Sequence, residues 1–238
     1  MANFVLVHGG CHGAWCWESC IDQLRQRGHR AAALDLPGSG ADSTPRQNVA
    51  IADYTRAICA LVESQSERVV LVGHSIAGAT LASVASMLSD EVAALIYVAA
   101  FVPKPGERLF DLIPADRREV YLEQASKSAD NTLRVGFEVA RARFFNDLSR
   151  EQARTYYNRL TPQALSVYFD RAEVDPTSLA CQRSYIICLQ DKTIELPLSR
   201  EHALRSGGRV FEIDAAHDVM LSCPELLVRC LENSLGEC

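Results

Sequence analysis

Residues 69–78 read VVLVGHSIAG, an apolar run that ends in Gly-His-Ser and continues into small residues. This pattern predicts a short buried strand, a sharp turn and then a helix, with Ser75 at the apex of the turn. Such a junction is typical of a nucleophile elbow, whose strained turn lifts the serine hydroxyl clear of the sheet. Strand and helix nearly touch there, so small residues are needed on both sides, and Gly73, Ala77 and Gly78 supply them. Although Ala77 stands where glycine is usual, the stretch predicts a serine nucleophile in an α/β fold.

The composition is that of an ordinary globular protein of one domain. The 238 residues are 48% hydrophobic and 23% charged, enough for one sizeable core. The net charge is −6 with no basic run, which disfavours nucleic-acid partners and anionic membranes. The apolar run near the N-terminus is too short for a signal peptide, and no stretch approaches the ~20 apolar residues of a membrane span. We therefore expect a cytoplasmic protein without a membrane partner.

The nine cysteines favour no special chemistry. Their number is odd, and no Cys-x-x-Cys pair occurs among positions 11, 16, 20, 59, 181, 188, 223, 230 and 238. A disulfide framework is not expected in a domain of this size without a secretory signal. We interpret the cysteines as small structural residues, with Cys238 exposed at the terminus.

Short apolar runs alternate with helix-length segments, which predicts a mainly parallel six-stranded sheet flanked by helices. The expected strands are Asn3–Val7, Arg30–Leu36, Arg68–Val72, Ala93–Val98, Ser184–Leu189 and Arg209–Ile213. The expected helices are Trp15–Arg27, Ile51–Ser64, Ile76–Leu88, Leu196–Ser206 and Pro224–Asn233. The last of these follows Ser222, which we expect to form a capping box with Glu225 around Pro224.

The alternation stops between Val102 and Leu179. No good strand is expected there, but helix-like segments occur, for example Thr132–Phe145 and Arg150–Arg159. This predicts a helical cap at 102–179, inserted into a core formed by 1–101 and 180–238. The cap is not an independent domain, because the sheet resumes after it.

Two later residues complete a catalytic constellation with Ser75. A serine hydroxyl needs a general base, and the base needs a carboxylate that orients it. The elbow fold supplies them in the chain order Ser, Asp, His. Asp191 and His217 each follow an expected strand, at the sheet edge where open α/β sheets build their sites.

Each of these residues also has a structural interpretation. Ser75 could be a helix N-cap, Asp191 a turn residue and His217 a surface loop residue. Asp214 and Asp218 are rival acids, but they adjoin His217 in sequence and would reach its Nδ1 awkwardly. The constellation therefore favours Asp191 as the orienting acid.

The glycine-rich loop after the first strand predicts an oxyanion hole, which needs two backbone N–H groups. We expect one from Ile76, directly after the nucleophile, and one from Gly10, where glycine allows close approach of the substrate. Gly9 and Gly10 could instead be simple turn residues. His12 lies in the same loop, and no histidine pattern implies a metal.

The chain resembles the plant methyl esterase and hydroxynitrile lyase family of α/β-hydrolases and its bacterial esterase relatives. The segments that carry the resemblance read FVLVHGGCHGAWCW at 4–17, GHR at 28–30, ALDL at 33–36, DYT at 53–55, VLVGHS at 70–75, AAFVP at 99–103, QDK at 190–192 and HDVMLSCP at 217–224. The resemblance is weakest across the cap. It implies an α/β-hydrolase fold, a triad of Ser75, Asp191 and His217, oxyanion donors at Gly10 and Ile76, and ester hydrolysis without a cofactor.

Two departures separate this chain from the lyases of that family. The lyases carry a lysine directly after the catalytic histidine, whose charge stabilises the departing cyanide, and here Asp218 would repel an anion. They also carry a threonine where this chain has Gly9. Both departures favour the hydrolytic branch.

We therefore predict a serine esterase that cleaves a small, largely apolar ester, with an amide or carbamate as alternative substrates. The resemblance suggests a methyl ester or methyl carbamate. The residues expected to line the substrate site are His12, Phe101, Phe145 and Val219. An apolar cap surface is compatible with a homodimer. The alternatives are a carbon–carbon lyase and a slow ligand receptor on the same scaffold, since fold alone does not fix function.

Overall fold

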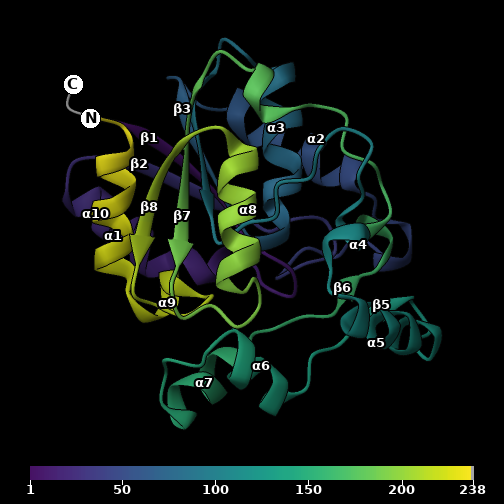
Figure 1. Ribbon diagram of the computed structural model, residues 1–238. Helices are drawn as coiled ribbons and strands as arrows, with labels where there is room; N and C mark the ends of the chain where they lie inside the picture. Colours follow the sequence, from purple (N-terminus) through teal and green to yellow (C-terminus); the bar gives the residue numbers. More distant parts are fainter. Residues whose placement is uncertain (237–238) are drawn as a thin grey trace.

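A parallel sheet lies at the centre of the computed structural model, which describes residues 1–236 (Figure 1). Its six strands stand in the order β2-β1-β3-β4-β7-β8, and all neighbouring pairs are parallel. The bounds are β1 Asn3–Val7, β2 Arg30–Leu34, β3 Val69–His74, β4 Val92–Val98, β7 Gln182–Cys188 and β8 Arg209–Ile213. The predicted fold class and all six predicted strands are confirmed.

Helices cover both faces of the sheet. Their bounds are α1 Glu18–Gln26, α2 Ile51–Glu63, α3 Gly78–Met87, α8 Leu196–Ser206 and α10 Pro224–Ser234. Figure 1 shows α1 and α10 on one face, with α2, α3 and α8 on the other. Because side chains alternate along a strand, Phe4 and Leu6 of β1 pack on the α1 and α10 side, whereas Val5 and Val7 pack on the opposite side. This double burial explains why an inner strand such as β1 reads as a continuous apolar run.

Two helix starts differ from expectation. A 3₁₀ turn at Ala14–Trp17 precedes α1, so the predicted helix Trp15–Arg27 is divided. The capping box predicted at Ser222 is absent, because Ser222 ends the short helix α9, Val219–Ser222, and Cys223 becomes the N-cap of α10 without a side-chain bond. Ser222 therefore has helical backbone, and an N-cap needs a non-helical one.

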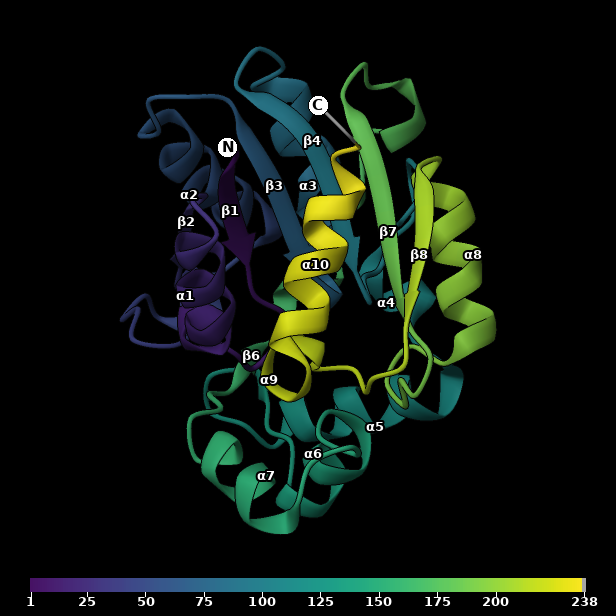
Figure 2. The same cartoon turned by 90° about the vertical axis from the view of Figure 1, so that its left-hand side faces the viewer.

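Residues 102–179 hold four helices and a small sheet. The helices are α4 Leu109–Leu112, α5 Ala115–Ser126, α6 Phe137–Arg143 and α7 Arg150–Tyr157. The expectation of no strand here is wrong, because β5 Thr132–Leu133 pairs antiparallel with β6 Gln163–Ala164. Figures 1 and 2 show α5, α6 and α7 beyond the carboxyl ends of the central strands. The segment thus covers the sheet edge at which sites form.

The described cysteines are all free thiols, and Cys238 lies outside the described residues. Burial raises the pKa of the Cys20 thiol to about 12, so this group stays protonated and packs as a small apolar residue. Across residues 1–236, none of the helices has both the length and the hydrophobicity to cross a bilayer.

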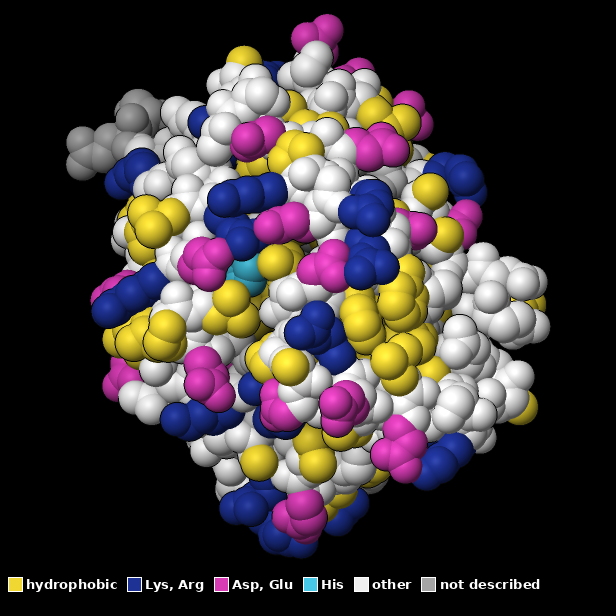
Figure 3. Space-filling view, turned by 45° about the vertical axis from the view of Figure 1, so that its right-hand side comes forward, with side chains coloured by type: hydrophobic (Ala, Val, Ile, Leu, Met, Phe, Trp, Pro, Cys, Tyr) yellow, Lys and Arg dark blue, Asp and Glu magenta, His cyan; other side chains and the backbone are white. Residues whose placement is uncertain are grey.

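The surface carries both signs of charge in close mixture. Lys and Arg side chains lie beside Asp and Glu over the face drawn in Figure 3. Ion pairs join some of them, for example Arg205 with Glu107 at 2.6 Å and Arg108 with Asp111 at 2.7 Å. Arg205 is 12% exposed, whereas Arg108 and Asp111 are about one-third exposed. Solvent-exposed pairs contribute at most about 1 kcal/mol each, so the buried layers dominate stability.

Replacing Gly78 with alanine should destabilise the fold at the start of α3. A Cβ there would lie 2.3 Å from the Phe101 carbonyl oxygen, a rigid backbone atom. Even after a helix-propensity gain of roughly 1 kcal/mol, we expect the free energy of unfolding to fall by about 2 kcal/mol. Urea denaturation measures this. Gly136→Ala is the matched control, because a Cβ at Gly136 would meet nothing within 4 Å, and an equal loss in both variants would contradict the prediction.

Candidate active site

The turn after β3 holds Ser75 in a strained conformation. Its φ of 56° lies in the left-handed region, which costs energy for any residue with a side chain. Space for the turn comes from Gly73, where a Cβ would lie 2.8 Å from the Leu81 side chain. The Phe101 N–H donates to the Ser75 carbonyl at 3.0 Å, which fixes the turn against the loop that follows β4. The strain therefore presents the hydroxyl at the carboxyl edge of the sheet.

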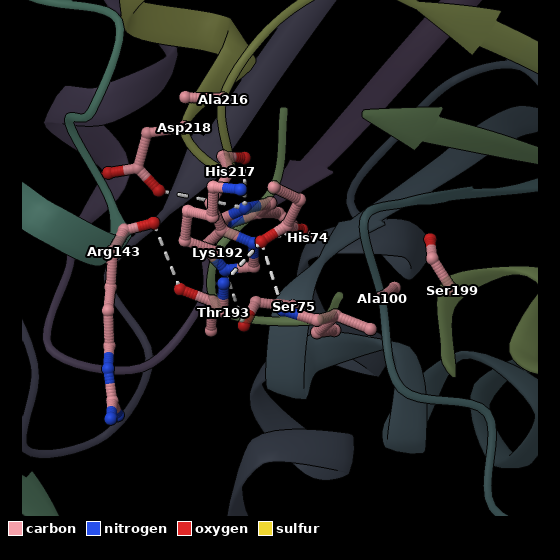
Figure 4. A network of polar contacts seen from close by, with 12 residues as sticks. His74, Ser75, Ala100, Arg143, Lys192, Thr193, Ser199, Ala216, His217 and Asp218 are labelled. Atoms are coloured by element: carbon pink, nitrogen blue, oxygen red, sulfur yellow. Dashed lines mark hydrogen bonds and ion pairs between the residues drawn. The ribbon is translucent and has the colours of Figure 1, made fainter. Parts of the chain in front are cut away.

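Ser75, His217 and Asp191 form a continuous hydrogen-bonded chain. The Ser75 Oγ lies 3.1 Å from His217 Nε2, and His217 Nδ1 lies 2.7 Å from Asp191 Oδ2. The other oxygen of Asp191 accepts from the N–H groups of Thr193 at 2.6 Å and Ile194 at 2.9 Å. Figure 4 shows Ser75 and His217 turned toward one another, beside the loop of Lys192 and Thr193. The acid follows β7 and the histidine follows β8, so three strand ends build the site.

The electrostatics of His217 suit a general base. Burial lowers its pKa, but the charge and hydrogen bond of Asp191, with a further contribution from Asp218, outweigh burial and leave the pKa raised. An imidazole held between a carboxylate and a hydroxyl can take the serine proton, and its protonated form is stabilised by the carboxylate. The arrangement can therefore generate an alkoxide-like nucleophile.

His74 holds the loop that carries His217 through a backbone hydrogen bond. Its Nε2 donates to the His217 carbonyl at 3.1 Å, and its Nδ1 has no partner among the described residues. Burial and the nearby His217 hold the pKa of His74 well below its usual range. His74 is thus a neutral structural group.

A metal site is a poor fit for the same side chains. Ligand atoms of His74, His217 and Asp218 come within 4.8 Å of one another. However, both ring nitrogens of His217 already contact Asp191 and Ser75, and His74 presents a proton. The cluster fits a hydrogen-bond network.

The two expected oxyanion donors face the same cavity. Gly10, Ser75 and Ile76 all line it, and its volume is about 260 Å³. Within residues 1–236 the Gly10 N–H has no acceptor, which leaves it available to a ligand. Ile76 begins the turn into α3, where N–H groups carry partial positive charge.

A second buried histidine–carboxylate pair braces this loop. His12 Nδ1 lies 2.7 Å from the Gly10 carbonyl, and its Nε2 lies 2.8 Å from Asp218 Oδ2, with His12 and Asp218 each 1% exposed. Burial works to raise the pKa of Asp218, but His12, His74 and His217 together lower it. Through these two contacts His12 ties the Gly10 loop to the His217 loop.

The cavity wall agrees only in part with the expected substrate residues. His12 and Phe101 line the cavity. Phe145 is instead buried in the small core between α6 and α7, and Val219 is buried beneath α1 and α10. The neighbouring Phe144 lines the cavity in place of Phe145, because consecutive residues at the end of α6 point in different directions.

Sequence reasoning missed the contacts by which residues 102–179 hold the catalytic loops. Asn146 Nδ2 donates to the Gln190 carbonyl at 3.0 Å, and Asp147 accepts from the Ala216 N–H at 2.8 Å. In sequence these two residues look like ordinary capping signals. They directly contact the neighbours of Asp191 and His217, and no local pattern reveals contacts between segments so distant in the sequence.

Removing the charge of Asp218 should lower the free energy of unfolding at neutral pH and weaken its dependence on acidic pH. Because the pKa of Asp218 is lowered in the folded protein, its ionised carboxylate stabilises the fold fully above the unfolded pKa. This stabilisation is lost as pH falls through the folded pKa. In Asp218→Asn we expect a free energy of unfolding lower by about 1–3 kcal/mol at pH 7, and a smaller decrease of that free energy between neutral and acidic pH. Denaturation at several pH values measures both, with exposed Asp214→Asn as control. Identical pH profiles for wild type and Asp218→Asn would contradict the assignment.

Comparisons with known proteins identify the family and the fold that this chain shares. The alpha/beta hydrolase family model matches residues 4–229. Methylesterase 7 of Arabidopsis thaliana is 28% identical, covering 94% of this chain and 93% of that protein. A carbendazim hydrolyzing esterase of Nocardioides sp. (strain SG-4G) is 30% identical, covering 95% and 97%. An extracellular α/β-hydrolase structure from a Paenibacillus species superposes with a TM-score of 0.92 at 23% identity over both whole chains, which shows the shared fold.

Proposed function

The chain belongs to the alpha/beta hydrolase family and is a carboxylic ester hydrolase acting on small esters, and we propose that Ser75 is its nucleophile. The observation that carries this proposal is the chain of contacts from Ser75 Oγ to His217 Nε2 at 3.1 Å and from His217 Nδ1 to Asp191 at 2.7 Å. In the proposed reaction Ser75 attacks the ester carbonyl while His217 takes its proton. Asp191 holds the imidazole in the tautomer that accepts at Nε2.

The Gly10 and Ile76 N–H groups stabilise the oxyanion of the tetrahedral intermediate in this proposal. His217 then gives its proton to the leaving alcohol, and an acyl-enzyme remains on Ser75. Water, activated by the same histidine, attacks the acyl-enzyme and releases the acid. Every proton moves between Ser75, His217, substrate and water, so the scheme needs no cofactor.

The segment 102–179 serves in this proposal as the cap over a core formed by 1–101 and 180–238. Its Tyr121, Leu133 and Phe144 line the cavity opposite Ser75, and a volume of about 260 Å³ suits a compact substrate. A methyl ester or methyl carbamate is the proposed scissile group, by analogy with the named relatives. Formation of a homodimer through the cap stays a prediction.

The lyase alternative is disfavoured by the group that follows His217. Asp218 occupies that position and is engaged by His12 at 2.8 Å, so a negative charge stands where cyanide departure would need a positive one. A receptor role would predict tight ligand binding with negligible turnover.

A serine-directed fluorophosphonate probe tests the proposed function. We expect the wild type to hydrolyse p-nitrophenyl acetate, to lose this activity on labelling, and to carry the probe on Ser75 in peptide mass spectrometry. Labelling of a different residue with loss of activity would reject the nucleophile assignment. Rapid cyanide release from mandelonitrile would favour the lyase instead.

A further inference from the structure

The cavity wall built by the cap carries an excess of positive charge. Three arginines line it, Arg117, Arg134 and Arg143, and Asp116 is the one acid that lines it within the described part of the chain. Ser75 and Phe101 line the same cavity from the core. In the described part of the chain, the arginines that line the cavity therefore all come from the cap.

Arg117 already has partners in the protein. Its guanidinium donates to the Thr193 carbonyl at 2.5 Å and to the Lys192 carbonyl at 3.5 Å, and lies 3.8 Å from Glu195. Its side chain is 11% exposed. Arg117 thus holds the loop that carries Asp191, and that loop engages part of its guanidinium.

Arg143 differs from Arg117 in having no partner. It is the last residue of α6 and is half-buried, and its guanidinium makes no hydrogen bond or ion pair with any described residue. Its backbone carbonyl accepts from the Thr193 hydroxyl at 3.1 Å, which anchors the residue beside the catalytic loop. In Figure 4 this dashed contact joins the backbone end of Arg143, and the side chain extends away from it without another.

The environment of Arg143 disfavours a cation. Burial, reinforced by the charge of Arg117, lowers the pKa of Arg143. Because a partly desolvated charge without a partner raises the free energy of the ligand-free protein, an anion that enters the cavity would relieve this cost. The guanidinium also offers a planar fork that fits a carboxylate in a bidentate arrangement.

We propose that Arg143 binds a carboxylate group of the substrate, so that the preferred substrates are esters with a second, ionised carboxyl group, such as monoesters of dicarboxylic acids. The inference rests on the proposed function, since it assumes that Ser75 attacks the ester carbonyl. One cavity is lined by both Ser75 and Arg143, so a flexible acyl chain can place its ester at the serine and its carboxylate at the arginine.

The test compares two esters that differ at the far end, where one carries a charge and the other a methyl ester: monomethyl adipate and dimethyl adipate. The measured quantity is the ratio of kcat/KM for the monoester to kcat/KM for the diester. We expect the wild type to favour the monoester, and Arg143→Met to lower the ratio about 10- to 100-fold, as for loss of a charge-assisted hydrogen bond. Arg143→Lys should keep part of the preference, because it retains the charge and loses the fork.

Arg141→Met is the matched control, because Arg141 is exposed on the same helix and its loss changes the net charge equally. The inference is overturned if Arg143→Met leaves the ratio unchanged, or if Arg141→Met lowers it as much. Ser75→Ala is assayed with the diester in parallel. Ser75-dependent cleavage of the diester without a monoester preference rejects this inference alone, whereas cleavage that survives Ser75→Ala rejects the proposed function.

Discussion

Ser75→Ala should lower kcat for p-nitrophenyl acetate by about 10⁴-fold or more, the range typical for loss of a triad nucleophile. The variant keeps the backbone of the elbow but removes the oxygen that lies 3.1 Å from His217 Nε2. No other described hydroxyl contacts the His217 ring, so none is placed to pass its proton to His217 in the same way. Steady-state kinetics at pH 8, with the burst of p-nitrophenol followed at short times, measures the effect.

The stability of the same variant provides the control. Ser75 has a φ of 56°, and alanine tolerates that conformation no better than serine, so we expect a similar free energy of unfolding. Binding of a product carboxylic acid should survive as well, because the Gly10 and Ile76 N–H groups are untouched. Activity of the folded variant within tenfold of wild type would remove Ser75 from the mechanism.

The sheet could be predicted because its inner strands β1, β3, β4 and β7 are largely buried on both faces. These strands therefore read as apolar runs bounded by turn residues, and the chemistry follows the strand ends. This reasoning identifies Asp191 and His217, since each comes shortly after a predicted strand. The short-range signals were sufficient because the fold places the carboxyl ends of parallel strands together.

Residues 102–179 were harder to predict, for a physical reason. Helices α4, α6 and α7 have only 4, 7 and 8 residues, and the pairing of Thr132 with Ala164 is set by tertiary contact. A strand of two residues has no periodicity to detect. The partnership of His12 with Asp218 joins residues that are 206 positions apart, so the sequence could indicate each residue but not the pair.

Asp191→Asn should lower kcat by about 10³–10⁴-fold, because an amide can donate to Nδ1 and so place the imidazole proton on Nε2, where it cannot accept from serine. The variant should also change the pH dependence. Asp191 raises the pKa of His217, and kcat/KM increases with pH as His217 loses its proton. We therefore expect the midpoint of this rise to lie above 6.5, the ordinary histidine value, in the wild type and to move to lower pH in Asp191→Asn.

The same experiment decides between Asp191 and its rival. Asp218 lies next to His217 in sequence, but its carboxylate contacts His12 at 2.8 Å, whereas Asp191 contacts His217 Nδ1 at 2.7 Å. If Asp191 is the orienting acid, Asp218→Asn lowers kcat far less than Asp191→Asn. The large loss of kcat caused by Ser75→Ala is then also seen in the Asp218→Asn background. The reverse order of effects, with both variants folded by circular dichroism, would assign the orienting role to Asp218. The geometry favours Asp191 because its carboxylate contacts His217 Nδ1 directly, whereas the carboxylate of Asp218 contacts His12.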